Sequence, residues 1–416
     1  MSEYVSALGA RFLVPTPMVS EACHACSFEE TYRRIAPILA KVPITRVYDA
    51  GRLDTVGLPV WSAVTPLAAD LTVHAGKGEH ALAAQLSAIM EAIERVSAES
   101  PPQESVERGT LRDMAERGGA PVIDPCLFDL PFETAFRDDT EFSWVTGFDI
   151  MSGSDVRVAL DLAISPAREG ICVGVETNGL AAGNTRTEAV LHALYEVVER
   201  DAVSEEEFRL RLHDRPDGDR GLRLIDLSTL PGRAAEWAAR IADNGLELVV
   251  QDITNSIGIP VYAAHVVDYS FPGAEGDALT FAGYGADLNP ARAVLRAVTE
   301  AVQSHTGVML AARDAFEGTE SVMSRADSLR RRADLINLPG CLPFPRGSSS
   351  TGDILGDVER VVAQLRAARL THCVVVDLTR TDLEIPVVRV LVPGLAGPYG
   401  YSSRRPGLRL LRSVLP

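Results

Sequence analysis

The segment SAIMEAIER, residues 87–95, is the first of three similar segments that follow one another at intervals of roughly a hundred residues. The other two are ALYEVVER at 193–200 and RAVTEAVQS at 296–304. Each contains an acidic residue and, three positions later, a carboxylate or an amide; the pairs are Glu91/Glu94, Glu196/Glu199 and Glu300/Gln303. Positions i and i+3 share one face of an α-helix. The sequence therefore predicts three related helices, each presenting a polar pair.

Apolar side chains surround these pairs. In the first helix Leu86, Ile89 and Val96 occupy positions that leave little room for a wide polar face. A buried carboxylate is costly unless a cation meets it, and a divalent metal that holds a polyphosphate suits several convergent carboxylates. We therefore interpret the chain as an ATP-using enzyme. The alternative is that the glutamates face solvent and pair with neighbours such as Arg95.

The second segment follows a glycine-containing loop, TNGLAAGNTRTE at 177–188. Backbone N–H groups at such a loop and helix start can bind phosphate oxygens. Glu188, His192, Glu196 and Glu199 then fall on one helical stripe, where three carboxylates repel one another unless a cation neutralises them. A solvated stripe, with His192 packed or at the surface, is the alternative. The loop is not a Walker A motif, and GKG at 76–78 lacks the residues needed to complete one.

The third segment adds Glu300 and Gln303, and Arg313 follows it. An arginine beside a transferring phosphoryl group acts by bidentate hydrogen bonding and by stabilising charge. Taken singly, Arg313 could equally form a structural ion pair with Asp314 or Glu317.

Composition excludes several classes of function. The 416 residues are 46% hydrophobic and 23% charged, with a net charge of -17. An acidic chain lacks the basic footprint of nonspecific nucleic-acid binding. No run of about 18 apolar residues and no signal-peptide pattern occurs, so we expect no membrane association and a cytoplasmic location.

The six cysteines do not form a disulfide framework. Cys23-His24-Ala25-Cys26 has the spacing of half a zinc site, yet no second pair completes the usual four ligands. A reduced, unliganded pair is therefore the favoured interpretation.

Helices alternate with strands along the chain, which predicts a mixed α/β fold of sheets and helices. The period of the quasi-repeat exceeds that of solenoids, about 20 to 50 residues, so we expect related substructures around one site. We expect an N-terminal extension, 1–43, and one catalytic domain, 44–416, with a C-terminal tail at 394–416. Residues 315–354 are predicted to form a mobile connection. Long helices are expected at about 27–41, 79–98, 186–208, 290–310 and 357–369.

These residues together resemble the YcaO family. The resemblance runs from about residue 44 to residue 393 and rests on GLPV at 57–60, GKG at 76–78, S-x3-E-x2-E at 87–94, NGLAAGN at 178–184, E-x2-ERD at 196–201 and TEA-x-QS at 299–304. It implies an ATP-binding fold, unrelated to P-loop and Rossmann proteins, in which ATP and Mg2+ lie among the three helices. By position, the resemblance assigns magnesium to Glu91, Glu94, Glu188, Glu196 and Glu199. It assigns nucleotide contacts to Ser87, Asn184, Arg200 and Gln303, and Arg313 is our further candidate.

The resemblance also implies the chemistry. Such enzymes activate a backbone amide of a ribosomally made precursor peptide: a nucleophile adds to the carbonyl carbon, and the resulting oxyanion takes the γ-phosphoryl group of ATP. A side-chain thiol or hydroxyl gives an azoline, sulfide gives a thioamide, and an amine gives an amidine. The segments at 35–64 are similar to stand-alone members associated with TfuA-like partners and thioamide or amidine formation. A partner protein and a homodimer are both left open.

Two positions depart from the family pattern. Ala181 stands where a hydroxyl residue is frequent, and His305 replaces an arginine, which removes a permanent cation. The alternative function is therefore a catalytically atypical, nucleotide-binding scaffold for a modifying partner.

Overall fold

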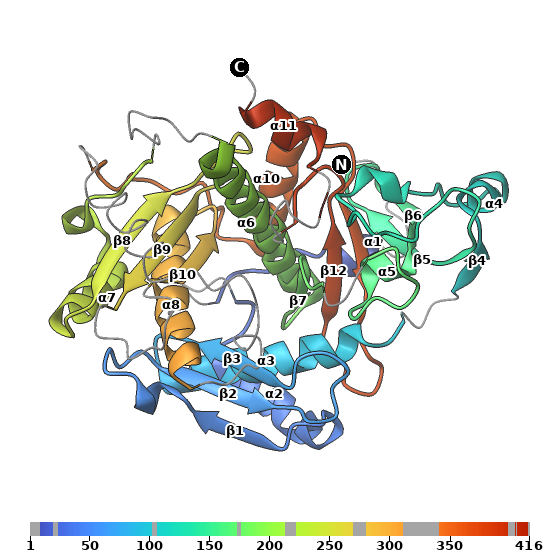
Figure 1. Ribbon diagram of the computed structural model, residues 1–416. Coiled ribbons are helices and arrows are strands. Elements are labelled where there is room, and N and C mark those ends of the chain that lie inside the picture. Colours follow the sequence, from blue (N-terminus) through green and yellow to red (C-terminus); the bar gives the residue numbers. More distant parts are fainter. Residues whose placement is uncertain are drawn as a thin grey trace.

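The computed structural model describes residues 9–19, 24–101, 106–172, 176–212, 222–268, 280–310, 341–397, 404 and 406–414. Strands in these residues form three antiparallel sheets. Figure 1 shows the sheets grouped around the long helices α3, α6 and α8, with α6 near the centre of the view. The predicted mixed α/β class is confirmed.

The first sheet has the order β1-β2-β3 and carries α3 on one face. The second has the order β10-β9-β8 and carries α8, with α7 against both α8 and β8. The elements are β1 (Arg46–Asp49), β2 (Val60–Val64), β3 (Val73–Lys77), α3 (Ala81–Ala98), α7 (Gly232–Asp243), β8 (Glu247–Asp252), β9 (Val261–Val267), β10 (Thr280–Ala286) and α8 (Pro290–Met309).

The third sheet has the order β4-β5-β11-β12-β7, and β6 pairs with β5. Helix α6 packs on β12 and β7, and α10 packs on α6. These elements are β4 (Glu107–Gly109), β5 (Phe142–Asp149), β6 (Ser154–Ala159), β7 (Leu180–Ala182), α6 (Arg186–Leu212), α10 (Ile354–Ala367), β11 (Val374–Asp377) and β12 (Val387–Leu391). Each of the three sheets therefore supports one of the helices that carry the polar pairs.

Short helices complete the described chain: α1 (Gly9–Phe12), α2 (Phe28–Ile35), η1 (Ala36–Lys41), η2 (Gly51–Leu53), α4 (Leu111–Glu116), η3 (Pro125–Leu127), α5 (Leu160–Ala163), η4 (Leu227–Thr229) and α11 (Leu408–Val414). Ser27 caps α2 by accepting a hydrogen bond from the Glu30 N–H. The expected helix at 27–41 therefore ends as an α-helix at Ile35 and continues as a 3-10 turn. No helix in the described ranges is long and apolar enough to cross a membrane.

The expected N-terminal extension packs closely on the rest of the fold. Phe12 is fully buried in the core around α6, and Ile35 is buried in the core beneath α3. Thr31 and Arg34 both hydrogen-bond Asn184, at the start of α6. The domain boundaries remain predictions, but these contacts place residues 24–35 beside the candidate site.

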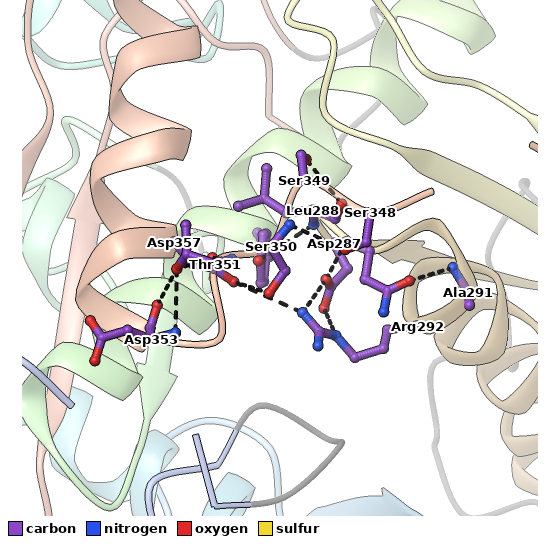
Figure 2. A network of polar contacts seen from close by, with 12 residues as sticks. Asp287, Leu288, Ala291, Arg292, Ser348, Ser349, Ser350, Thr351, Asp353 and Asp357 are labelled. Atoms are coloured by element: carbon purple, nitrogen blue, oxygen red, sulfur yellow. Dashed lines mark hydrogen bonds and ion pairs between the residues drawn. The ribbon is translucent and has the colours of Figure 1, made fainter. Parts of the chain in front are cut away.

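A serine-rich loop joins the α8 side of the fold to α10 (Figure 2). The buried Asp357 carboxylate accepts hydrogen bonds from the Ser350 hydroxyl and from the backbone and hydroxyl of Thr351, at 2.6 to 2.9 Å. Ser349 donates twice to the Leu288 carbonyl oxygen. These bonds anchor the end of the segment predicted as a mobile connection; residues 311–340 of the chain lie outside the described ones.

Glycines allow strands to approach the helices closely. A Cβ atom on Gly76 of β3 would lie 2.1 Å from the Ala88 nitrogen of α3, and one on Gly283 of β10 would lie 2.1 Å from the Ala301 nitrogen of α8. Real Cβ atoms do not come so close to backbone, so any larger residue would push the helix away from its sheet. The positions of the polar pairs therefore depend on these two glycines.

We predict that Gly283→Ala destabilises the protein by about 3 kcal/mol or more, because its Cβ meets helix backbone that cannot rotate away. Gly307→Ala in the same helix is the matched control, since its Cβ would meet no described atom within 4 Å. That change should be neutral or stabilise the fold by up to about 1 kcal/mol. Urea unfolding of both variants measures the difference, and equal midpoints would contradict the close-packing argument.

Candidate functional site

The three polar pairs lie close together in the folded chain. The Glu94 carboxylate of α3 lies near enough to Glu196 of α6 for that charge to help raise the pKa of Glu94, and Glu300 of α8 likewise helps to raise the pKa of Glu199 of α6. Segments about a hundred residues apart in sequence thus supply one acidic cluster. Convergence of the three helices, which the sequence pattern required, is present in the structure.

The second residue of each pair binds the backbone of the neighbouring substructure. Glu94 accepts a hydrogen bond from the Ala182 N–H of β7 at 3.2 Å, and Glu199 accepts one from the Ala286 N–H of β10 at 3.1 Å. The Gln303 amide nitrogen donates to the carbonyl oxygen of Ala75 in β3 at 2.7 Å. Helices α3, α6 and α8 therefore hold β7, β10 and β3 in a closed ring, which we call the helix–strand ring.

The first residue of each pair faces a cation. Glu300 forms an ion pair with Lys77 at 2.6 Å, whereas Glu91 and Glu196 lie 3.9 and 3.8 Å from the arginines one turn later, Arg95 and Arg200. The side chains of Glu91, Glu196 and Glu300 are 25%, 24% and 27% exposed. Partial exposure leaves these three carboxylates open to a ligand, whereas Glu199 is only 4% exposed.

Burial and mutual repulsion control the charge of the cluster. Burial raises the pKa of Glu196 to about 7, with Glu199 adding repulsion and Arg200 opposing it. Burial and the nearby Glu196 hold the pKa of Glu94 well above its usual range. At Glu300, by contrast, Lys77 and Arg200 outweigh burial and lower the pKa. The cluster favours added positive charge, and its oxygen donors are those that Mg2+ prefers.

The residues predicted to contact the nucleotide lie on different elements of the fold. Ser87 is exposed on α3, one turn before Glu91. Asn184 is buried, and its amide links the Thr31 hydroxyl to Glu188. Arg200 and Gln303 lie in the cluster as described above, whereas Arg313 lies outside the described residues.

Glu188 is separated along α6 from the other two predicted magnesium ligands of that helix. It lies two turns before Glu196 on α6, about 12 Å away along the helix. Its carboxylate accepts hydrogen bonds from the Ala25 backbone and the Asn184 amide, and it pairs with His24 at 2.9 Å. Burial lowers the pKa of the adjacent His192 to about 4. The N-terminal segment therefore contacts the Glu188 carboxylate, an interaction that the sequence did not predict.

Sequence reasoning did not assign four further residues, of which three lie near the cluster and the fourth, His24, contacts Glu188. Glu300 belongs to the repeated pattern and Lys77 to the GKG segment, so both carried a signal that we did not convert into a site assignment. Arg389 of β12 is 3% exposed, and it lies near enough to Glu196 for that negative charge to affect the pKa of the guanidinium group. Nothing in the local sequence of β12 marks Arg389, because only the sheet brings it beneath α6. His24 belongs to the Cys-x-x-Cys segment and likewise reaches the site only through folding.

The two departures from the family pattern are accommodated by their surroundings. Ala181 is buried in β7, opposite Val388 of β12. His305 is buried between two carboxylates, with its ring nitrogens 3.1 Å from Asp54 and 3.2 Å from Asp268. Burial opposes the charged ring, but the two aspartates outweigh it and raise the pKa of His305. The expected loss of positive charge at this position is thus partly compensated.

We predict a pH-dependent contribution of His305 to stability. Because its folded-state pKa is raised, the stabilisation is complete below the unfolded value of about 6.5 and is lost as the pH rises through the folded value. The difference in unfolding free energy between the wild type and His305→Gln should therefore be largest near pH 6 and smaller at pH 9. Urea unfolding across this range measures it, with Asp54→Asn as the partner variant; a difference that grows with pH would contradict the assignment.

Comparison with known proteins identifies the family of the chain. A family model described as YcaO cyclodehydratase, ATP- and Mg2+-binding, matches residues 75–396. The chain belongs to the YcaO family, as its motifs predicted, and this is a family of ATP- and Mg2+-binding proteins. An uncharacterised protein in the tfuA 3' region of Rhizobium leguminosarum bv. trifolii is 32% identical over 399 residues, which cover 92% of this chain and 91% of that protein.

Solved structures agree with this assignment. YcaO from Methanopyrus kandleri, bound with AMPPCP and Mg2+, is 26% identical and superposes with a TM-score of 0.72, covering 91% of this chain and 94% of that one. A heterocyclase in complex with substrate and cofactor is 23% identical with a TM-score of 0.74 and shows the shared fold. This chain is covered to 94% in that match but spans only 55% of the longer heterocyclase. The predicted YcaO fold is confirmed.

Proposed function

We propose that this protein uses ATP and Mg2+ to phosphorylate the oxygen of a backbone amide in a ribosomally made precursor peptide. The observation that carries the proposal is the convergence of Glu91, Glu94, Glu196, Glu199 and Glu300 from three helices, with Lys77, Arg95 and Arg200 beside them. Membership of an ATP- and Mg2+-binding family supports the same proposal.

The carboxylates suit magnesium. The proposed ligands are Glu91, Glu94, Glu196 and Glu199. Glu188 can join them once the contacts of the N-terminal segment with its carboxylate are released. Glu300 is added because of its position in the cluster. Burial, together with neighbouring negative charge, raises the pKa values of Glu94, Glu196 and Glu199, so added positive charge would stabilise these three carboxylates. Bound Mg2+ would neutralise charge on the phosphoryl oxygens of ATP. Ser87, Asn184, Arg200, Gln303 and Arg313 remain the proposed nucleotide contacts.

The residues of the chain contribute position and charge to the reaction. A nucleophile adds to the amide carbon, the carbonyl oxygen becomes an oxyanion, and this oxygen takes the γ-phosphoryl group of ATP. Inorganic phosphate then leaves with the former amide oxygen, which alone would be a poor leaving group. Lys77 and Arg200 are placed to balance negative charge at this stage, because both already face the acidic cluster.

The nucleophile decides the product. The relative beside tfuA in Rhizobium supports the view that this chain works with a TfuA-like partner, and thus favours sulfide as nucleophile and a thioamide as product. Azoline formation by a side-chain thiol or hydroxyl, and amidine formation by an amine, use the same activation. Azoline formation is the second candidate, because the fold is shared with a heterocyclase.

The scaffold alternative has less support. It rests on Ala181 and His305. Ala181 pairs with Val388 in the third sheet, and His305 bridges Asp54 and Asp268. The acidic pairs themselves are complete, which favours an enzyme that performs its own phosphoryl transfer.

We predict that Glu196→Gln and Glu199→Gln each lower peptide-stimulated ATP turnover at least about 100-fold, because each removes a proposed metal-binding charge. Phosphate release, measured with precursor peptide and partner, reports the effect. Glu359→Gln, an exposed position on α10, is the control and should keep full activity. If peptide modification continues unchanged in both cluster variants, the scaffold alternative is favoured instead.

A second prediction concerns the product. With sulfide supplied, the peptide should gain mass as one oxygen is replaced by sulfur, whereas azoline formation, or amidine formation by an amine of the peptide itself, would remove one water. Mass spectrometry of the peptide, with and without a sulfide source and the TfuA-like partner, distinguishes these outcomes. Loss of water without any requirement for sulfide would contradict the thioamide assignment while leaving amide activation intact.

A further inference from the structure

A second group of potential metal ligands lies at the start of α6, where His192 also hydrogen-bonds the backbone of Ala182 in β7. It consists of His24, just before α2, and Glu188 and His192 on α6. Glu188 and His192 are four residues apart and so share one helix face. One nitrogen or oxygen from each of the three side chains lies within 4.8 Å of the others. Two imidazoles and a carboxylate therefore meet where two distant segments pack together.

The surroundings hold this group in place. The Ala25 N–H donates to one oxygen of Glu188 and the Asn184 amide to the other, while Thr31 in turn donates to Asn184. The rings of His24 and His192 meet edge to face, with centroids 5.5 Å apart. Hydrogen bonds that orient ligating side chains are typical of metal sites. The Glu188 side chain is 2% exposed and that of His24 is 27% exposed, so the group lies near the surface on its His24 side.

We propose that His24, Glu188 and His192 form a binding site for a transition metal ion, best matched by Zn2+. Imidazole nitrogens favour zinc and related metals, whereas Mg2+ prefers oxygen ligands. Three protein ligands of this kind, with one position left open, are a common zinc arrangement. Tetrahedral zinc places its ligand atoms about 3.4 Å apart, so side-chain movements of roughly 1 Å would close the site.

Cys26 is the candidate for the open position. It is partly buried and free of disulfide bonds, and it lies near enough to Glu188 for that carboxylate to help raise the pKa of the thiol, after burial and Glu30. The sequence suggested half of a zinc site at the Cys-x-x-Cys segment. In the site proposed here, the further ligands are His24 from within that segment and Glu188 and His192 from α6. Cys23 lies outside the described residues.

The proposal differs from the magnesium assignment and is tested without it. Glu188 belongs to both sets, so the two metals would compete for one carboxylate, but zinc binding requires the two histidines and magnesium does not. The competing explanation is that the contact of His24 with Glu188 only fastens the N-terminal segment to α6. Measuring zinc in the absence of nucleotide and peptide separates these possibilities from any failure of the proposed function.

The experiment titrates Zn2+ into the chelator-treated full-length protein in competition with a chromogenic chelator. We expect one tightly bound equivalent, and a loss of affinity of at least about 100-fold in His24→Ala and in His192→Gln, since each removes a direct ligand. His372→Ala is the matched control, because His372 is similarly exposed and also pairs with a carboxylate, Asp149, at 3.0 Å. That variant should bind zinc as the wild type does.

Further measurements make the result decisive. Mg2+ alone should not displace the zinc, and Glu91→Gln should leave zinc affinity unchanged. Visible absorption of the Co2+-loaded wild type reports the ligands without any substitution: tetrahedral bands with weak or single-thiolate charge transfer support the proposal. Zinc affinity unchanged in both histidine variants, or lost only in Cys23→Ser and Cys26→Ser with strong two-thiolate charge transfer, would overturn it.

Discussion

Three hydrogen bonds from helix side chains to neighbouring strands connect the substructures of this fold. Glu94, Glu199 and Gln303 each reach across to the backbone of a different sheet. The donor and acceptor roles account for the residue types. A carboxylate can accept from the N–H groups of Ala182 and Ala286, but only an amide can donate to the Ala75 carbonyl. The third pair therefore ends in glutamine, whereas the first two end in glutamate.

The helix–strand ring also explains how like charges can be held together. The second residue of each pair is engaged by backbone, and the first residue faces Lys77, Arg95 or Arg200 and remains about a quarter exposed. Burial, and after it the repulsion between neighbouring carboxylates, raises the pKa values of Glu94, Glu196 and Glu199. The fold therefore holds a local excess of negative charge, and under the function we propose bound Mg2+ would relieve it.

The N-terminal segment adds a layer that the pattern of repeats does not contain. Residues 24–35 lie against the start of α6 and engage Asn184 and Glu188, the two family-motif residues at that end of the helix. Their carboxylate and amide groups are satisfied by the chain itself. Any ligand that draws on Glu188 must therefore exchange with these contacts, so the segment before α2 influences what binds at this end of the site.

The sequence alone determined the family, the α/β class and the three helices with their polar pairs, because helical spacing and apolar neighbours are local properties. It also placed α3, α6 and α8 to within a few residues. Tertiary structure decided which member of each pair bonds a neighbouring strand and which lies beside a cation, because that depends on the groups opposite it. It likewise brought His24 to His192, Lys77 to Glu300 and Arg389 beneath Glu196, contacts between segments whose proximity depends on how sheets and helices pack and which no local pattern encodes.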